Sequence, residues 1–216
     1  MTVRDFMTEK LVTVTPQTPI FDAIDLMKKH DIHRLPVIED NQLVGLITQG
    51  VIQESMPSKA TSLSVFELNY LINKTKVGDV MLKDVTTIEA DALLEDAIKV
   101  MRTKSIGVLP VMEKNQLVGI ITNNDIFDAF LKISGYENGG VRVILKITKE
   151  HHGILAGIAK ELADAQMNIE TIVVNRLSKG IFVEIQLATK DVEKLKAVLT
   201  SDDYELVDVV LTNTIM

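Results

Sequence analysis

The most informative absence in this 216-residue sequence is cysteine, which does not occur at all. Disulfides, thiolate zinc sites and a cysteine nucleophile are therefore excluded. Tryptophan is missing too, and aromatic residues make up only 4%. Basic residues are not in excess either, because 23 of them face 30 acidic residues, for a formal charge of −7. Since phosphate repels such a chain at long range, we expect no nucleic-acid partner.

Long apolar runs are also lacking. No stretch reaches the roughly 18 uncharged apolar residues of a membrane span, and the start, MTVRDFMTEKLVTV, has no apolar run behind a basic segment. We therefore expect a cytoplasmic protein without a membrane partner. The four histidines lie in two close pairs without acidic or cysteine partners at ligand spacing, so we expect no metal. No catalytic motif is recognisable, so we expect no enzyme.

What the sequence does contain is an internal repeat. Residues 3–54 align with residues 77–128 without a gap, at an offset of 74, and 21 of the 52 paired positions are identical. The stretch NQLVGLIT at 41–48 returns as NQLVGIIT at 115–122. We infer a duplicated module, with one repeat in residues 1–60 and the other in 61–132.

Each repeat predicts the order β-α-β-β-α. In the first, residues 11–15 read as a short strand and 19–30 as an amphipathic helix. Strands over 35–38 and 43–48 flank a turn that contains an asparagine, which tolerates left-handed backbone. A helix follows the threonine that ends the last strand of each repeat, which is Thr48 in the first and Thr122 in the second. Residues 64–73 predict either the rest of the first exit helix or a separate helix.

The pattern changes after a glycine-rich linker at residues 133–140. Residues 141–216 predict the order β-α-β-β-α-β, with a hairpin turn at Ser178-Lys179-Gly180. Right-handed crossovers in that order give a four-stranded, ferredoxin-like sheet with its helices on one face. The fold class predicted for the whole chain is therefore α+β.

The two repeats differ immediately after the shared stretch. In the second repeat, Thr122 ends a strand and Asp125 lies in the first turn of the next helix. An ionised carboxylate there can accept hydrogen bonds from both cis hydroxyls of a ribose. The matching residues of the first repeat are Thr48 and Val51, and valine accepts no hydrogen bond. The alternative is that Asp125 only caps its helix.

The repeats also differ before each Leu-Pro-Val. The first has His33-Arg34 and the second has Gly107-Val108. A guanidinium is suited to phosphate, and histidine adds a titratable donor. Alternatively, the basic pair only complements a helix dipole. If the repeats pack about a pseudo-two-fold axis, one cleft combines Asp125 with His33 and Arg34. The other cleft then combines Val51 with Gly107 and Val108, which offer neither a carboxylate nor a cation.

The repeated pattern Asp-x-Met…Leu-Pro-Val…Val-Gly-(Ile/Leu)-Ile-Thr-x-x-Asp resembles paired cystathionine-β-synthase (CBS) domains, or Bateman modules, over residues 1 to about 132. The resemblance implies an adenosyl ligand such as AMP, ADP, ATP, S-adenosylmethionine, NAD or cyclic di-AMP. It implies that Thr-x-x-Asp holds the ribose, that the basic pair reaches phosphate, and that the strand entry flanks adenine. The site residues so predicted are Thr122, Asp125, His33, Arg34, Val14, Pro16, Ile20 and Ile121.

The C-terminal segment resembles an ACT domain in His152-Gly153-Ile154-Leu155 and Asn168-Ile169. The resemblance implies an amino-acid site at Gly153, Ile154, Asn168 and Ile169; alternatively, this domain only pairs subunits. A CBS pair followed by an ACT domain is similar to acetoin-utilisation B-type proteins. The resulting hypothesis is a non-enzymatic, homodimeric ligand sensor. The alternative is an oligomerisation module without a small-molecule ligand.

Overall fold

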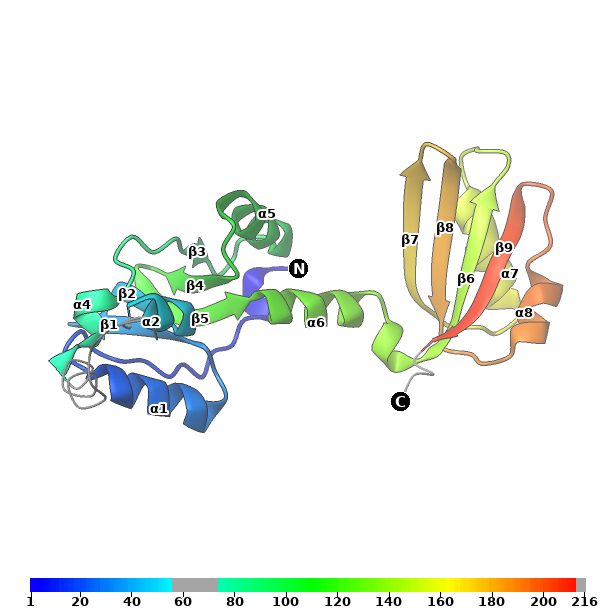
Figure 1. The fold of residues 1–216 in the computed structure, drawn as a ribbon. Helices are drawn as coiled ribbons and strands as arrows, with labels where there is room; N and C mark the ends of the chain where they lie inside the picture. Colours follow the sequence, from blue (N-terminus) through cyan, green and yellow to red (C-terminus); the bar gives the residue numbers. More distant parts are fainter. Residues whose placement is uncertain (56–73, 213–216) are drawn as a thin grey trace. The chain divides into compact units, whose positions relative to one another are not determined.

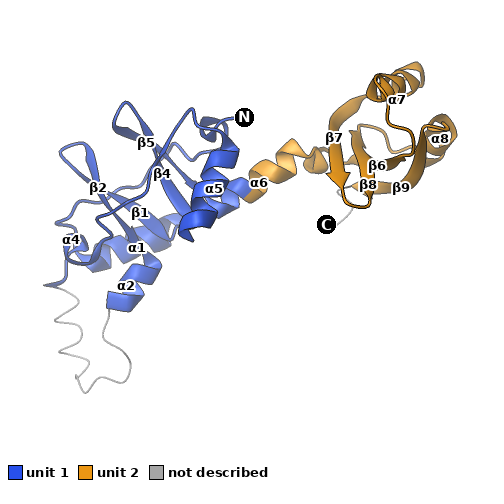
Figure 2. Ribbon diagram, turned by 90° about the horizontal axis from the view of Figure 1, so that it is seen from above, with its two compact units in different colours: residues 1–126 blue, residues 127–216 orange. Residues whose placement is uncertain are grey.

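A computed structural model describes residues 1–55 and 74–212 (Figure 1). The chain divides into two compact units, residues 1–126 and 127–216 (Figure 2). The helix predicted at residues 64–73 lies outside the described residues. Among the helices that are described, none is long and apolar enough to cross a membrane.

The first repeat begins with a 3-10 turn, η1 (Val3–Asp5), and its remaining elements are α1 (Ile20–His30), β1 (Arg34–Glu39), β2 (Gln42–Thr48) and α2 (Gln49–Ser55). β1 and β2 form an antiparallel hairpin. Its turn residues Asp40 and Asn41 have φ of 48° and 61°, as the asparagine predicted. The apolar stripe of α1 is buried in the core of this repeat, through Ile20, Ala23 and Met27.

The second repeat has the elements α4 (Val77–Val80), β3 (Ile88–Glu89), α5 (Leu94–Lys104), β4 (Val108–Glu113), β5 (Gln116–Thr122) and α6 (Asn123–Ile133). Its hairpin has the same register as the first, with Val108 opposite Thr122 where Arg34 lies opposite Thr48. The turn residue Asn115 again has positive φ, at 63°. The duplication seen in the sequence is therefore a duplication of the local fold.

The prediction of a strand at residues 11–15 is wrong. Only Val14 pairs there, in a parallel bridge with Val37 of β1. The corresponding strand of the second repeat, β3, is two residues long. The pairing cannot extend because Pro36 has no N–H to donate, and Pro16 follows in the incoming segment.

Each repeat lends its N-terminal segment to the other repeat. Thr8 pairs with Ile120 of β5 through N–H···O bonds of 2.9 and 3.0 Å. In the same way Leu82 pairs with Leu46 of β2 through two bonds of 2.9 Å. The two repeats of the first unit are thus interlocked by a reciprocal backbone exchange.

The second unit contains β6 (Gly140–Ile147), α7 (Ile154–Asp164), β7 (Ile169–Leu177), β8 (Gly180–Leu187), α8 (Val192–Val198) and β9 (Tyr204–Thr212). Its sheet has the order β7-β8-β6-β9 with all neighbours antiparallel. Figure 2 shows α7 and α8 on one face of this sheet. The element order predicted for the segment is therefore present, and β6 begins inside the predicted linker, which also contains a 3-10 turn (Tyr136–Asn138).

Candidate functional site

A cleft of about 440 Å³ opens between the two repeats of the first unit. The first repeat contributes His33, Arg34 and the segment from Thr48 to Gly50, and the second contributes Asp84 to Thr86 and Ile106 to Val108. The pairing of Leu82 with Leu46 holds the incoming segment of the second repeat against β2, and the residues that follow Leu82 line the cleft. We call this cavity the Thr48 cleft.

Arg34 extends from the first repeat into the second. In the β1–β2 register it lies opposite Thr48. A Cβ placed on Gly107 would lie 3.3 Å from Nη2 of Arg34 and 2.9 Å from Nδ2 of Asn123. The guanidinium therefore lies beside the residue that follows Thr122. No described residue forms an ion pair or hydrogen bond with the side chain of Arg34, and Arg34 is half-buried.

This geometry corrects the predicted division of residues between two clefts. We expected the basic pair in one cleft and Gly107-Val108 in the other, but all four residues line the Thr48 cleft. Hairpin pairing holds Arg34 opposite Thr48 of its own repeat, while the packing of the repeats brings both strand entries together. Arg34 consequently lies between the Thr48 turn and the Thr122 turn.

Thr122 and Asp125 form a closed turn at the start of α6. Oδ2 of Asp125 accepts hydrogen bonds from the Thr122 N–H at 2.6 Å and from its hydroxyl at 2.7 Å. The Asp125 N–H in turn donates to Oγ1 of Thr122 at 3.5 Å. The capping interaction therefore exists, yet Oδ1 has no hydrogen-bond partner among the described residues, and Asp125 is half-exposed. One carboxylate oxygen remains available to a ligand.

The corresponding turn of the first repeat has the same backbone and lacks the carboxylate. The Val51 N–H donates to Oγ1 of Thr48 at 3.2 Å, as Asp125 does to Thr122. Val51 itself packs against the core of the first repeat. The difference between the two turns is therefore chemical rather than conformational.

Sequence reasoning missed the segment that accompanies each threonine turn. Asp84 lines the Thr48 cleft, and Lys10 is its counterpart at the offset of 74. The opposite charges of Lys10 and Asp84 were visible in the repeat alignment, but the place of Asp84 in the cleft was not.

Four residues of the predicted ligand site, Val14, Pro16, Ile20 and Ile121, do not line the Thr48 cleft. Val14, Ile20 and Ile121 are core residues with 5%, 2% and 0% exposure. Pro16 packs against Gly78, where a Cβ would lie 3.0 Å from its ring and from its carbonyl oxygen. The strand-entry residues that line the Thr48 cleft lie earlier in the repeat, because the incoming segment turns into the core after passing the other repeat's hairpin.

The CBS domain family model matches the duplicated region twice, over residues 3–56 and 77–132. The chain belongs to the CBS-domain family. It is 31% identical over 124 residues to the CBS domain-containing protein YhcV of Bacillus subtilis, which covers 57% of this chain and 81% of that protein. The two repeats are accordingly CBS repeats, and the first unit holds a CBS pair.

Two solved structures resemble the CBS pair. One is a Vibrio cholerae protein assigned to acetoin utilization (AcuB), which is 29% identical, with a TM-score of 0.54 over 63% of this chain and 95% of that one. The other is CBSX2 in complex with AMP, which is 34% identical, with a TM-score of 0.51 over 61% of this chain and 97% of that one.

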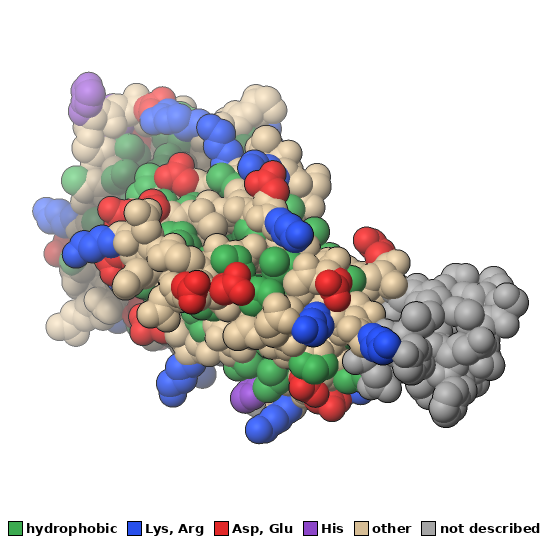
Figure 3. All heavy atoms as spheres, turned by 90° about the vertical axis from the view of Figure 1, so that its left-hand side faces the viewer, with side chains coloured by type: hydrophobic (Ala, Val, Ile, Leu, Met, Phe, Trp, Pro, Cys, Tyr) green, Lys and Arg blue, Asp and Glu red, His purple; other side chains and the backbone are tan. Residues whose placement is uncertain are grey.

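The surface of the CBS pair mixes charges. Figure 3 shows acidic and basic side chains interspersed over the face it draws, with apolar side chains between them. That face offers no extended basic surface of the kind that binds a nucleic-acid backbone. A cation such as Arg34 can therefore act on a small ligand locally, without a general attraction for polyanions.

A second cavity, of about 750 Å³, lies in the second unit, between the start of α7 and β7. Of the residues predicted for an amino-acid site, Gly153 and Ile154 line it, whereas Asn168 and Ile169 do not. Its walls are apolar, and its rim carries the Glu150–Arg176 ion pair at 2.5 Å. The Arg176 guanidinium lowers the pKa of the Glu150 carboxyl.

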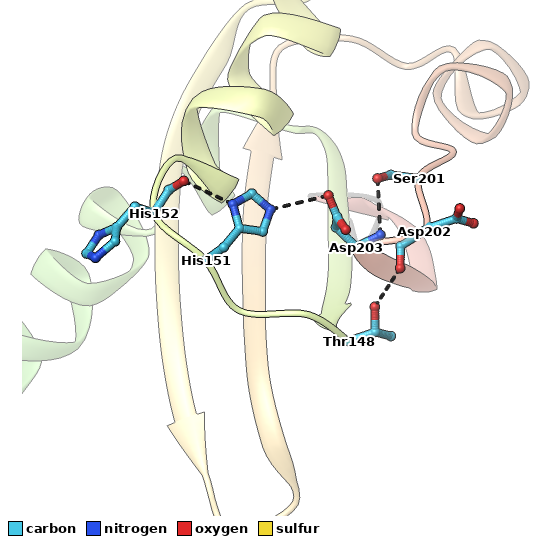
Figure 4. Close-up of polar contacts among 6 residues, drawn as sticks. All are labelled: Thr148, His151, His152, Ser201, Asp202 and Asp203. Atoms are coloured by element: carbon cyan, nitrogen blue, oxygen red, sulfur yellow. Dashed lines mark hydrogen bonds and ion pairs between the residues drawn. The ribbon is translucent and has the colours of Figure 1, made fainter.

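His151, on the rim of the same cavity, connects two loops (Figure 4). Its Nδ1 lies 3.0 Å from the His152 carbonyl oxygen, and its Nε2 lies 3.3 Å from the Asp203 carboxylate. These two acceptors, the carbonyl more than the carboxylate, raise the pKa of His151. No group of three or more histidine or acidic side chains that could hold a metal occurs in the described part of the chain.

Proposed function

We propose that this protein is a non-enzymatic regulator whose CBS pair binds an adenosyl ligand. Two features together carry this proposal. One oxygen of the Asp125 carboxylate is available to a ligand, and the half-buried side chain of Arg34, next to Asn123, has no ion-pair partner among the described residues. A ribose diol can donate to the carboxylate, and a phosphate can take the guanidinium as its counter-ion. The likeness to CBSX2, which was solved with AMP, supports an adenine nucleotide as the ligand class.

The residues we assign to this ligand act in two groups. Thr122 and Asp125 hold the ribose, with the Thr122 hydrogen bonds to Oδ2 fixing the carboxylate and leaving Oδ1 for the ligand. Arg34 supplies positive charge for phosphate and His33 a further hydrogen-bond donor, and we add Lys10 because it is the counterpart of Asp84, which lines the Thr48 cleft. A phosphorylated ligand therefore meets these basic residues and the carboxylate, whereas an unphosphorylated nucleoside uses the carboxylate alone.

For the second unit we propose an ACT-like domain, residues 141–216, that pairs two chains into a homodimer and binds an amino acid. Its ferredoxin-like strand order and the cavity beside Gly153 support this assignment. Arg176 and Glu150 are complementary to the carboxylate and ammonium groups of an amino acid, and the apolar walls suit an aliphatic side chain. We keep Asn168 and Ile169 as predicted site residues on the resemblance alone.

A structural module without a ligand is the second candidate. The observation in its favour is that Oδ2 of Asp125 is fully engaged in capping its own helix. In that case Arg34 would carry no counter-ion in the functional protein. The two candidates differ in whether any adenosyl compound stabilises the fold.

A thermal-shift panel distinguishes them. We expect AMP, ADP, ATP, S-adenosylmethionine, NAD or cyclic di-AMP to raise the melting temperature by several degrees, since a ligand at 100 times its Kd adds about 2.7 kcal/mol. Common amino acids in the same panel test the second unit. No shift with any nucleotide supports the structural module, and turnover of a bound nucleotide contradicts the regulator.

A further inference from the structure

Gly107 occupies the point at which the side chain of Arg34 crosses from the first CBS repeat to the second. The backbone there does not require a glycine, because Gly107 is not among the residues with positive φ. What the position does require is space. The volume that a Cβ would fill is bounded by Nδ2 of Asn123 at 2.9 Å and by Nη2 of Arg34 at 3.3 Å.

The Arg34 guanidinium, which lies beside Gly107, is suited to bind an anion. Arg34 is half-buried, and no described residue pairs with it. A partly desolvated, unpaired guanidinium is unfavourable until an anion neutralises it, and its planar fork suits phosphate oxygens. Asp84 lines the same cleft but forms no ion pair with Arg34. The counter-ion is therefore best supplied by a ligand.

The position of the Arg34 guanidinium relative to both threonine turns makes its contact with a ligand selective for phosphate. Arg34 lies opposite Thr48 in the hairpin, while its Nη2 lies beside Asn123, which immediately follows Thr122. If it were pushed back from Gly107, the guanidinium would retreat toward its own repeat and away from the Thr122–Asp125 turn. The adenosine part of a ligand held by Asp125 would not be affected by that retreat.

We propose that Gly107 is a positioning residue that sets ligand specificity. Its missing side chain lets the Arg34 guanidinium reach the second repeat, where the guanidinium selects phosphorylated adenosyl ligands over adenosine. This inference rests on the proposed adenosyl-binding function, since it concerns how that ligand is discriminated.

The test is calorimetric titration of the full chain with AMP and, separately, with adenosine. Gly107→Ala is expected to weaken AMP binding about tenfold, the effect of one weakened charged hydrogen bond, and to leave adenosine binding unchanged. Arg34→Gln is expected to lower AMP affinity at least as much. Gly157→Ala, in α7 of the second unit, is the control, because a Cβ there would meet no heavy atom within 4 Å, and it should change neither affinity.

Each other outcome has a definite meaning. If Arg34→Gln loses AMP affinity while Gly107→Ala keeps the wild-type ratio of AMP to adenosine affinity, the role of Gly107 is overturned. If Gly107→Ala weakens both ligands equally, the glycine only shapes the cleft, and the inference is also overturned. If the wild-type chain binds neither ligand, the proposed function itself fails. Unchanged melting temperatures of the unliganded variants confirm that they are folded.

Discussion

The two CBS repeats have one scaffold and two chemistries. Their hairpins have the same register, their turns contain the same left-handed asparagine, and each lends its N-terminal segment to the other. They differ at three matching positions, where the first has His33-Arg34 and Val51, and the second has Gly107-Val108 and Asp125. The residues that build the fold are thus duplicated, while those we assign to the proposed ligand have diverged, and we propose unequal roles for the two turns.

The largest expected effect comes from removing the carboxylate of the second repeat. Asp125→Ala should weaken AMP binding about a hundredfold, because charged hydrogen bonds contribute about 1.5–3 kcal/mol each and 1.4 kcal/mol is a factor of ten. Val51→Ala, at the matching position, should leave AMP affinity unchanged. Calorimetry of both variants makes the comparison.

Because Asp125 also caps α6, Asp125→Asn is a useful companion variant. Its amide oxygen can still accept from Thr122, so the thermal stability of the unliganded protein should be close to that of the wild type. Its AMP affinity should still fall, because the charge is gone. Full AMP affinity in Asp125→Ala would contradict the proposed ribose contact.

The next largest effect is expected from giving the first repeat the carboxylate that it lacks. Val51→Asp should create a second, weaker nucleotide site, since the Val51 N–H already donates to Thr48 as the Asp125 N–H does to Thr122. The new site should be the weaker one because the carboxylate of Asp84, which lines that cleft, repels phosphate. The stoichiometry measured by calorimetry should rise from one to two nucleotides per chain. Two equal sites in the wild-type chain would refute the asymmetry.

The smallest expected effect is on stability, at a glycine that both repeats share and that contacts the incoming segment of the other repeat. A Cβ on Gly45 would lie 2.4 Å from Sδ of Met81, and one on Gly119 would lie 2.5 Å from Sδ of Met7. Each Gly→Ala change should therefore lower the free energy of unfolding by about 1–3 kcal/mol, as overpacking does. Gly45→Ala should cost more, because its Cβ also meets the Leu82 carbonyl oxygen at 3.0 Å.

Urea denaturation measures these two variants, with Gly50→Ala as the control in the same unit, because a Cβ there meets only Oγ1 of Thr48, at an ordinary contact distance of 3.8 Å. Destabilisation by only one of the pair would show that the reciprocal exchange does not contribute equally in the two directions. Unchanged stability in both would show that the incoming segments can shift without cost.

Local elements were predictable because their signals are local. The helix predicted over residues 19–30 is α1, and the strands around Asn41 are β1 and β2, since apolar spacing and turn chemistry act within a few residues. The strand predicted at residues 11–15 failed because it was judged from alternation alone. Its pairing partner contains Pro36, which offers no N–H at that point.

Among the predicted site residues too, those determined by local sequence differ from those that depend on tertiary packing. Thr122 and Asp125 form their turn as predicted from three-residue spacing. The residues predicted to flank adenine were placed by their position in the repeat, and the structure buries Val14 and Ile20 in its core. Apolar residues at a strand entry can face a ligand or the core, and only the packing partner determines which.

The sequence by itself determined that a β-hairpin module occurs twice and that only one copy retains a carboxylate in its threonine turn, because repetition and capping are written in neighbouring residues. The tertiary structure alone decided which residues meet across the repeats. Thr8 reaches Ile120 over more than half of the chain, and Arg34 reaches Asn123 through the space at Gly107. Such contacts depend on how two finished hairpins pack, and no local pattern in the chain records them.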